Sequence, residues 1–113
     1  MTSCAKYGTM VSTFYMNLKG TVKSKESTQV INGIKVEVIN SLQTSNGITD
    51  ANGAFSINAE IDDVDNSVSL HVSDIDGALN GSYLSKDTII TLSADEKLAQ
   101  IKENIDIKLI KNE

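Results

Sequence analysis

Side chains that bear oxygen crowd two short segments of the chain. In the first segment, Asp74, Asp76 and Asn80 lie within seven residues of one another, and in the second, residues 62–66 hold three aspartates and an asparagine. Ca²⁺ takes about six to eight hard oxygen ligands, and extracellular modules bind it at roughly 10⁻⁴ to 10⁻³ M. We therefore take Asp74, Asp76 and Asn80 as a candidate weak Ca²⁺ site and expect no other cofactor.

The spacing in this segment departs from the best-known calcium loop. Counting from Asp74, Leu79 and Ser85 stand where an EF-hand needs glycine and a bidentate glutamate. The alternative is that the Asp and Asn residues are ordinary turn residues, because their side chains hydrogen-bond to nearby backbone. Both interpretations stay open.

The single cysteine, Cys4, is a candidate for lipid attachment. Thr2 and Ser3 place small side chains directly before it, as at the end of a bacterial lipobox. An acyl chain contributes about 0.8 kcal/mol per buried CH₂, so a diacylated cysteine would hold the domain on a bilayer. The alternative is a free thiol in a frayed terminus. One cysteine excludes an internal disulfide and a multi-cysteine metal site.

Catalytic residues are not indicated. His71, the only histidine, alternates with Leu70 and Val72, so we expect it to face solvent. The chain lacks a Gly-x-Ser-x-Gly elbow and a glycine-rich phosphate loop. Glycoside hydrolysis needs sugar-stacking aromatic side chains, and the chain has two phenylalanines and three tyrosines. We predict that the protein is not an enzyme.

Net charge and hydropathy limit the classes of partner that we expect for this protein. The net charge is −5 and every basic residue is lysine, which disfavours nucleic acid, since phosphate binding needs a basic patch. No run approaches the roughly 18 apolar residues of a transmembrane helix, so membrane contact is expected only through a lipid. We predict a flexible segment over residues 1–11, a single domain over residues 12–113 and a monomer.

Turn signals recur along the chain. Each is an Asn or Asp followed by Gly, a pair that tolerates the positive φ of tight hairpin turns. The pairs are Asn32-Gly33, Asn46-Gly47, Asn52-Gly53, Asp76-Gly77 and Asn80-Gly81. Their number predicts repeated strand reversal.

Apolar and polar residues alternate between these turns. The alternation covers residues 14–22, 34–38, 68–72 and 105–109. Shorter strands are expected at 42–44, 55–57 and 88–92. Strict alternation means one buried and one wet face, so about seven strands predict an all-β antiparallel sandwich with an immunoglobulin-like Greek key. The core would hold Val, Ile and Leu with Phe14 and Phe55.

One segment indicates a helix. Ser93 and Glu96 have the spacing of a capping box, which predicts a short helix over residues 94–102. The side chains facing the sheet would be Leu98 and Ile101, and those facing solvent would be Lys97 and Lys102. Such a short helix must dock on the sheets to be stable. An irregular loop is the alternative.

Three segments carry a family resemblance. They are Lys-Gly-Thr-Val at 19–22, Gly-Ile-Lys-Val-Glu-Val at 33–38 and Thr-Asp-Ala-Asn-Gly-Ala-Phe-Ser-Ile at 49–57. In this order they resemble the carboxypeptidase regulatory-like domains, which implies a transthyretin-like sandwich in which a tight turn precedes Phe55. That fold also hosts the hydroxyisourate hydrolases, which use a set of His and Arg residues. The chain has one His and no Arg, so this activity is not expected.

A narrower resemblance covers nearly the whole chain. Tyr-Gly-Thr at 7–9, the segment 72–77 with Asn80-Gly81, and the closing strand 105–109 are similar to small lipoproteins associated with radical-SAM proteins in Bacteroides-like bacteria. This implies a lipid-anchored protein of the bacterial cell envelope, in the periplasm or on the cell surface, with no assigned biochemical role.

We therefore expect a non-enzymatic envelope module that acts in protein–protein contact or structural display. Its contact surfaces would be the sheet edges and a loop over residues 74–87, and its partner is not identified. One alternative is a small-ligand or carbohydrate-binding module, with or without Ca²⁺, for which Tyr15 and Tyr83 would be the exposed rings. Another is an accessory partner or a substrate of a radical-SAM system.

Overall fold

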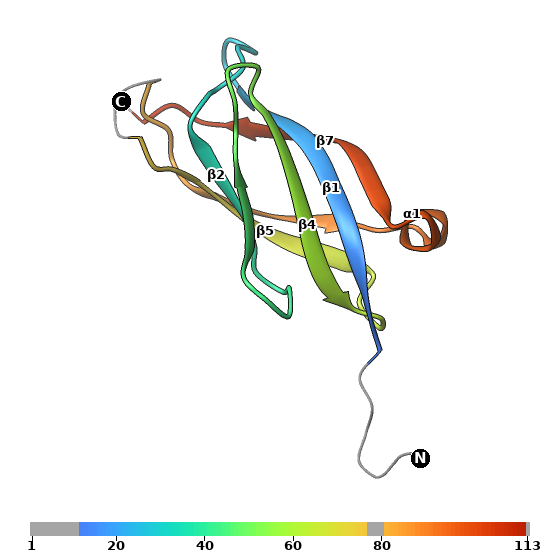
Figure 1. Cartoon of the computed structure of the whole chain (residues 1–113). Coiled ribbons are helices and arrows are strands. Elements are labelled where there is room, and N and C mark those ends of the chain that lie inside the picture. The colour runs from blue at the N-terminus through green and yellow to red at the C-terminus, as the bar shows by residue number, and fades with distance from the viewer. Residues whose placement is uncertain (1–11, 77–80, 113) are drawn as a thin grey trace, which may run out of the picture.

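The computed structural model describes residues 12–76 and 81–112. Within them, seven strands and one short helix form an all-β fold of two sheets (Figure 1), which confirms the predicted fold class. The strands are β1 (Thr13–Ser24), β2 (Ile34–Val38), β3 (Ser45–Ile48), β4 (Ala54–Asp62), β5 (Ser67–Asp74), β6 (Lys86–Thr91) and β7 (Ile101–Leu109), and the helix is α1 (Ala94–Ala99). No helix in this part of the chain is long and apolar enough to cross a membrane.

The two sheets have the strand orders β4-β1-β7 and β3-β2-β5-β6. Neighbouring strands are antiparallel with one exception, because β7 runs parallel to β1. The antiparallel expectation missed this pair. Parallel neighbours need a crossover rather than a tight turn, and β1 and β7 are the first and last strands of the described residues.

The core lies between the sheets and follows the predicted alternation. The inward side chains of β1, among them Met16, Leu18 and Val22, are fully buried, and alternate residues of β2 and β5 face them. Phe55 is buried and Phe14 packs against the core from its margin. Burying a Val, Leu or Ile side chain stabilises the fold by about 1.5–3 kcal/mol.

Strand boundaries differ from the predicted ones where pairing decides them. The segment 42–44 is not a strand, since β3 begins at Ser45. The N–H of Leu42 donates instead to the carbonyl of Glu60 in β4 at 2.9 Å. β4 is longer than predicted because it pairs with β1 from Thr13–Asp62 to Thr21–Ala54.

The turn between β3 and β4 confirms the expected role of the Thr-Asp-x-Asn-Gly run. Asp50 Oδ1 accepts hydrogen bonds from the N–H groups of Asn52 (2.8 Å) and Ala54 (3.0 Å), and Gly53 has a φ of 68°. Thr49 is buried beside it: its Oγ1 accepts from Ile34 N at 2.9 Å and donates to Ile31 O at 2.7 Å. The turn carries the chain from one sheet to the other.

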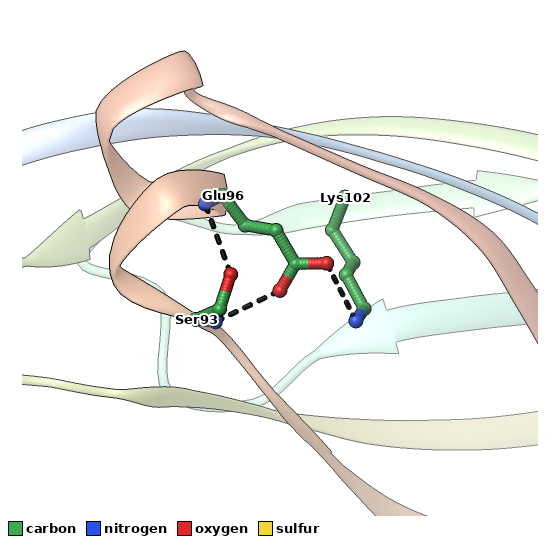
Figure 2. Close-up of polar contacts among 3 residues, drawn as sticks. All are labelled: Ser93, Glu96 and Lys102. Atoms are coloured by element: carbon green, nitrogen blue, oxygen red, sulfur yellow. Dashed lines mark hydrogen bonds and ion pairs between the residues drawn. The ribbon is translucent and has the colours of Figure 1, made fainter.

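Helix α1 begins as the capping box predicts (Figure 2). Ser93 Oγ accepts from Glu96 N at 3.1 Å, and Glu96 Oε1 accepts from Ser93 N at 2.8 Å. Lys102, on β7, reaches back so that its Nζ lies 2.8 Å from Glu96 Oε2. The same glutamate therefore caps the helix and ties it to the following strand.

The predicted extent and orientation of this helix were wrong. It ends at Ala99, and Gln100 has left-handed backbone angles. Asn17 of β1 donates its N–H to Gln100 O at 3.0 Å, and Ile101 is paired with Asn17. The helix therefore ends here because pairing with β1 begins β7. Leu98 is 86% exposed, whereas Lys97 lies over the Phe14 ring, 5.5 Å from its centroid.

Candidate functional site

The outer face of the sheet β3-β2-β5-β6 carries a row of titratable side chains. The register places Glu37 of β2 opposite His71 of β5, and His71 opposite Asp87 of β6. Paired residues of neighbouring strands share a face of the sheet. The three side chains therefore cross the sheet side by side, with the histidine between two carboxyl groups.

The side chains of His71 and Asp87 are in hydrogen-bond contact at the surface. His71 Nδ1 lies 2.6 Å from Asp87 Oδ1, and the aspartate side chain is 82% exposed. The predicted surface position of His71 is confirmed. Exposed pairs of this kind contribute about 0–1 kcal/mol to stability. Within residues 12–76 and 81–112, no three His, Cys, Asp or Glu side chains are grouped so that they could hold a metal ion.

Two exposed isoleucines lie in the next row of the same face. Ile39 follows β2 and donates its N–H to Ser69 O at 2.8 Å, and Ser69 is paired with Ile89 of β6. Ile39 is 57% exposed and Ile89 is 68% exposed. Together with Ser69 and the His71–Asp87 pair they line an open hollow of about 680 Å³. We call this surface the Ile39–Ile89 patch.

Sequence reasoning missed this patch, although one signal was present. Ile89 and Ile90 are adjacent in a strand, so they must face opposite sides of the sheet. Ile90 packs against the core and Ile89 therefore points outward. The approach of Ile39 could not be predicted, because it depends on the register of β2, β5 and β6.

Two of the predicted cation ligands, Asp74 and Asp76, lie at and just after the end of β5. Asp74 Oδ2 accepts from Tyr83 N at 3.1 Å, and Asp74 Oδ1 accepts from Asp76 N at 3.3 Å. Partial burial raises the pKa of Asp74, and a hydrogen bond with the Asp76 side chain raises it further. Asn80 lies outside the described residues. Asp74 thus accepts hydrogen bonds from Asp76 and Tyr83, as a turn residue would. Cation binding stays a prediction.

The two tyrosines predicted to be exposed differ from each other. Tyr15 of β1 is exposed, as expected. Tyr83 is partly buried and packs against the core, and its backbone pairs with Lys111. The expected exposed ring at Tyr83 is therefore wrong, because the pairing with the C-terminal segment holds that residue inward.

The second acidic segment, residues 62–66, is held by the helix. Lys97 Nζ donates to Asp63 O at 2.9 Å and to Asn66 Oδ1 at 3.0 Å. Asp62 Oδ1 accepts from Val64 N at 3.1 Å within the turn itself. These oxygens therefore serve to position α1 and to close the turn between β4 and β5.

The fold and the surfaces described above define an all-β, two-sheet domain with an apolar patch beside an edge strand. Comparison of the sequence with protein-family models and with curated proteins finds no match. Cys4, the candidate lipid-attachment residue, lies outside the described residues.

Proposed function

We propose that this protein is a non-enzymatic module for protein–protein contact, and that the Ile39–Ile89 patch is its contact surface. The exposure of both isoleucines over one hollow is the observation that supports the proposal. Grouped apolar side chains with a polar rim are typical of interaction sites. Here Ser69 and the His71–Asp87 pair supply the rim.

The size of the patch favours a weak contact. Burying one isoleucine contributes about 1.5–3 kcal/mol, and association itself costs free energy. Two isoleucines alone would therefore support at best a Kd of roughly millimolar order. Attachment to a surface would raise the effective concentration of the module, so that weak contacts suffice. The proposed role is therefore compatible with display at a membrane.

The contact surface can be tested by photo-cross-linking in cells that express the full chain. A photoreactive amino acid replaces Ile89 in one variant and Ile48 in a matched control. Ile48 is 56% exposed, and its pairing with Lys35 places it on the same sheet face. We expect a discrete adduct from position 89 that Ile39→Ser weakens, and none from position 48. Equal labelling at both positions would contradict the proposal. So would a hydrolase or transferase activity that depends on one residue.

We further propose that a lipid on Cys4 holds the module at the bacterial cell envelope. The small residues before Cys4 and the resemblance of the chain to bacterial lipoproteins support this. Cells fed an alkyne-tagged fatty acid should incorporate the tag into the full chain. The Cys4→Ser variant should lose it, while Ser3→Ala, which keeps a small residue, should retain it. Equal tagging of the Cys4→Ser variant would exclude Cys4 as the attachment point.

A further inference from the structure

We infer that the partner binds by strand addition, as an extended segment that pairs with the free edge of β6. The segment would carry a lysine or arginine opposite Asp87 and an apolar residue opposite Ile89. This inference rests on the proposed contact role of the Ile39–Ile89 patch and specifies the chemistry of its occupant.

The two edges of this four-stranded sheet differ. β3, at one edge, lies against β4 of the other sheet, since a Cβ added at Gly47 would lie 3.1 Å from Ser56 O and from Ile57 Cγ1. β6 forms the other edge, and no strand lies beyond it in the part of the chain that the structure describes. An edge strand offers unpaired N–H and C=O groups to an incoming chain.

The hydrogen-bond pattern shows which groups of β6 are free to pair. Ile39 donates its N–H to its partner Ser69, so the odd-numbered residues of β5 bond toward β2. Antiparallel ladders alternate, so the even-numbered residues of β5 bond toward β6, where they meet Lys86, Thr88 and Ile90. The backbone groups of Asp87, Ile89 and Thr91 therefore point to the open edge.

The side chains beside this edge indicate what the added strand carries. Asp87, Ile89 and Thr91 have their side chains on the outer face, so opposite residues of an added strand would contact them. The carboxyl groups of Asp87 and Glu37 belong to one row, and Asp87 is 82% exposed. Opposite charges that face each other across strands attract, and like charges repel. A basic residue thus suits the position opposite Asp87.

A second copy of the chain suits the edge less well. Two copies of β6 paired about Ile89 would place Asp87 opposite Thr91, so the carboxyl group gains no cation. Lys86 is directed elsewhere, because its Nζ donates to Lys108 O at 3.2 Å. Each copy also carries a net charge of −5, which opposes close approach. The charges favour a basic segment from another protein.

Amide hydrogen exchange on the full chain tests the inference. The probe is a blocked hexapeptide, Thr-Thr-Val-Thr-Lys-Thr, whose antiparallel pairing puts Val opposite Ile89 and Lys opposite Asp87. At nine times its Kd, exchange at Asp87, Ile89 and Thr91 should slow about tenfold. A control peptide with Glu in place of Lys should bind about fivefold more weakly.

Variants separate strand addition from contact through side chains alone. Ile89→Pro removes an outward N–H and leaves the ladder to β5 intact, so it should abolish the protection. Ile48→Ser, which changes an exposed isoleucine of β3 outside the patch, should leave it unchanged. If the peptide shifts the methyl signals of Ile39 and Ile89 without slowing exchange, strand addition is wrong and the contact role stands. Absence of peptide binding overturns the inference, and the cross-linking experiment still judges the contact role. Concentration-dependent protection without peptide would identify a second copy as the occupant.

Discussion

Two of the edge strands, β6 and β7, differ in how their free edges are protected from pairing. β7 is bulged where it pairs with β1, since Leu18 pairs with Lys102 but Gly20 pairs with Ile105. Asn104, inside the bulge, has a φ of 61°. The exposed side chains of β7 include Glu103, Asp106 and Lys108. Bulges and charges are the usual means by which proteins prevent pairing at an edge.

The second half of β6 has neither a bulge nor charged side chains. Its register with β5 is unbroken, and Ile89 and Thr91 follow the charged residues Lys86 and Asp87. The free edge of β7 is therefore protected from pairing, whereas the free edge of β6 can pair with another strand. The comparison indicates that the open edge of β6 is a property of that strand, not of the fold as a whole.

The largest loss of stability is expected where β7 pairs with β1. A Cβ added at Gly20 would lie 2.2 Å from Ile105 O and 2.7 Å from Ile105 Cβ. Gly20→Val should therefore force the two strands apart and lower the free energy of unfolding by about 3 kcal/mol. Urea denaturation measures this loss. Lys19→Val, at an exposed neighbouring position, is the control and should change stability little. An unchanged midpoint for Gly20→Val would contradict this packing of β7.

The bulge itself can be tested at Asn104. Its positive φ is strained for a branched side chain, so Asn104→Val should cost about 1–2 kcal/mol. Asn104→Gly should be tolerated, because glycine adopts this conformation readily. Denaturation midpoints of the two variants make the comparison. Equal losses for both would mean that the asparagine side chain, not its backbone, is what matters there.

The connection from β6 to β7 depends on the cap of α1. Ser93→Ala removes the hydroxyl that accepts from Glu96 N and should cost about 1 kcal/mol. Ser93→Asp keeps an acceptor and should restore most of the stability. Thermal unfolding followed by circular dichroism measures both. If alanine and aspartate behave alike, the capping box contributes nothing to the connection.

The sequence predicted those features of the fold that depend on interactions between residues close together in the chain. The cap at Ser93 and Glu96 was predictable because both partners lie within one turn of helix. The end of α1 was not, since it depends on Asn17, far away in the chain, which draws Gln100 and Ile101 into pairing with β1. Propensity gives way where tertiary pairing competes with it.

The same distinction holds for the candidate site. Alternation predicted that His71 faces solvent, because the direction of a side chain follows from its position in one strand. The contact of His71 with Asp87 and the grouping of Ile39 with Ile89 depend on which residues lie opposite across strands. The register is set by the whole sheet. A single sequence therefore shows which residues could form the patch, but it does not show that Ile39 and Ile89 lie close together.

A smaller effect is expected from the contact that ties β7 to α1. The Lys102 ammonium, followed by the N–H of Ser93, holds the pKa of Glu96 below its ordinary 4.5. Because the folded pKa lies below the unfolded value, the contact stabilises the fold above the unfolded pKa, and that stabilisation is lost as pH falls through the folded pKa. Lys102→Met should raise the pKa of Glu96 toward its ordinary value in a carboxyl NMR titration. Lys108→Met should not.

The smallest change in stability is expected at the open edge. Ile89 contacts solvent over most of its surface, so Ile89→Ser should change the free energy of unfolding by less than about 0.5 kcal/mol. Ile90→Ser, one residue along, removes a side chain that packs on the core and should cost clearly more. Urea denaturation compares the pair. A residue that adds nothing to the fold, yet exposes an isoleucine beside unpaired backbone groups, is better explained by contact with another molecule than by stability. A large loss in Ile89→Ser would give the isoleucine a structural role and remove that reason to assign it to contact.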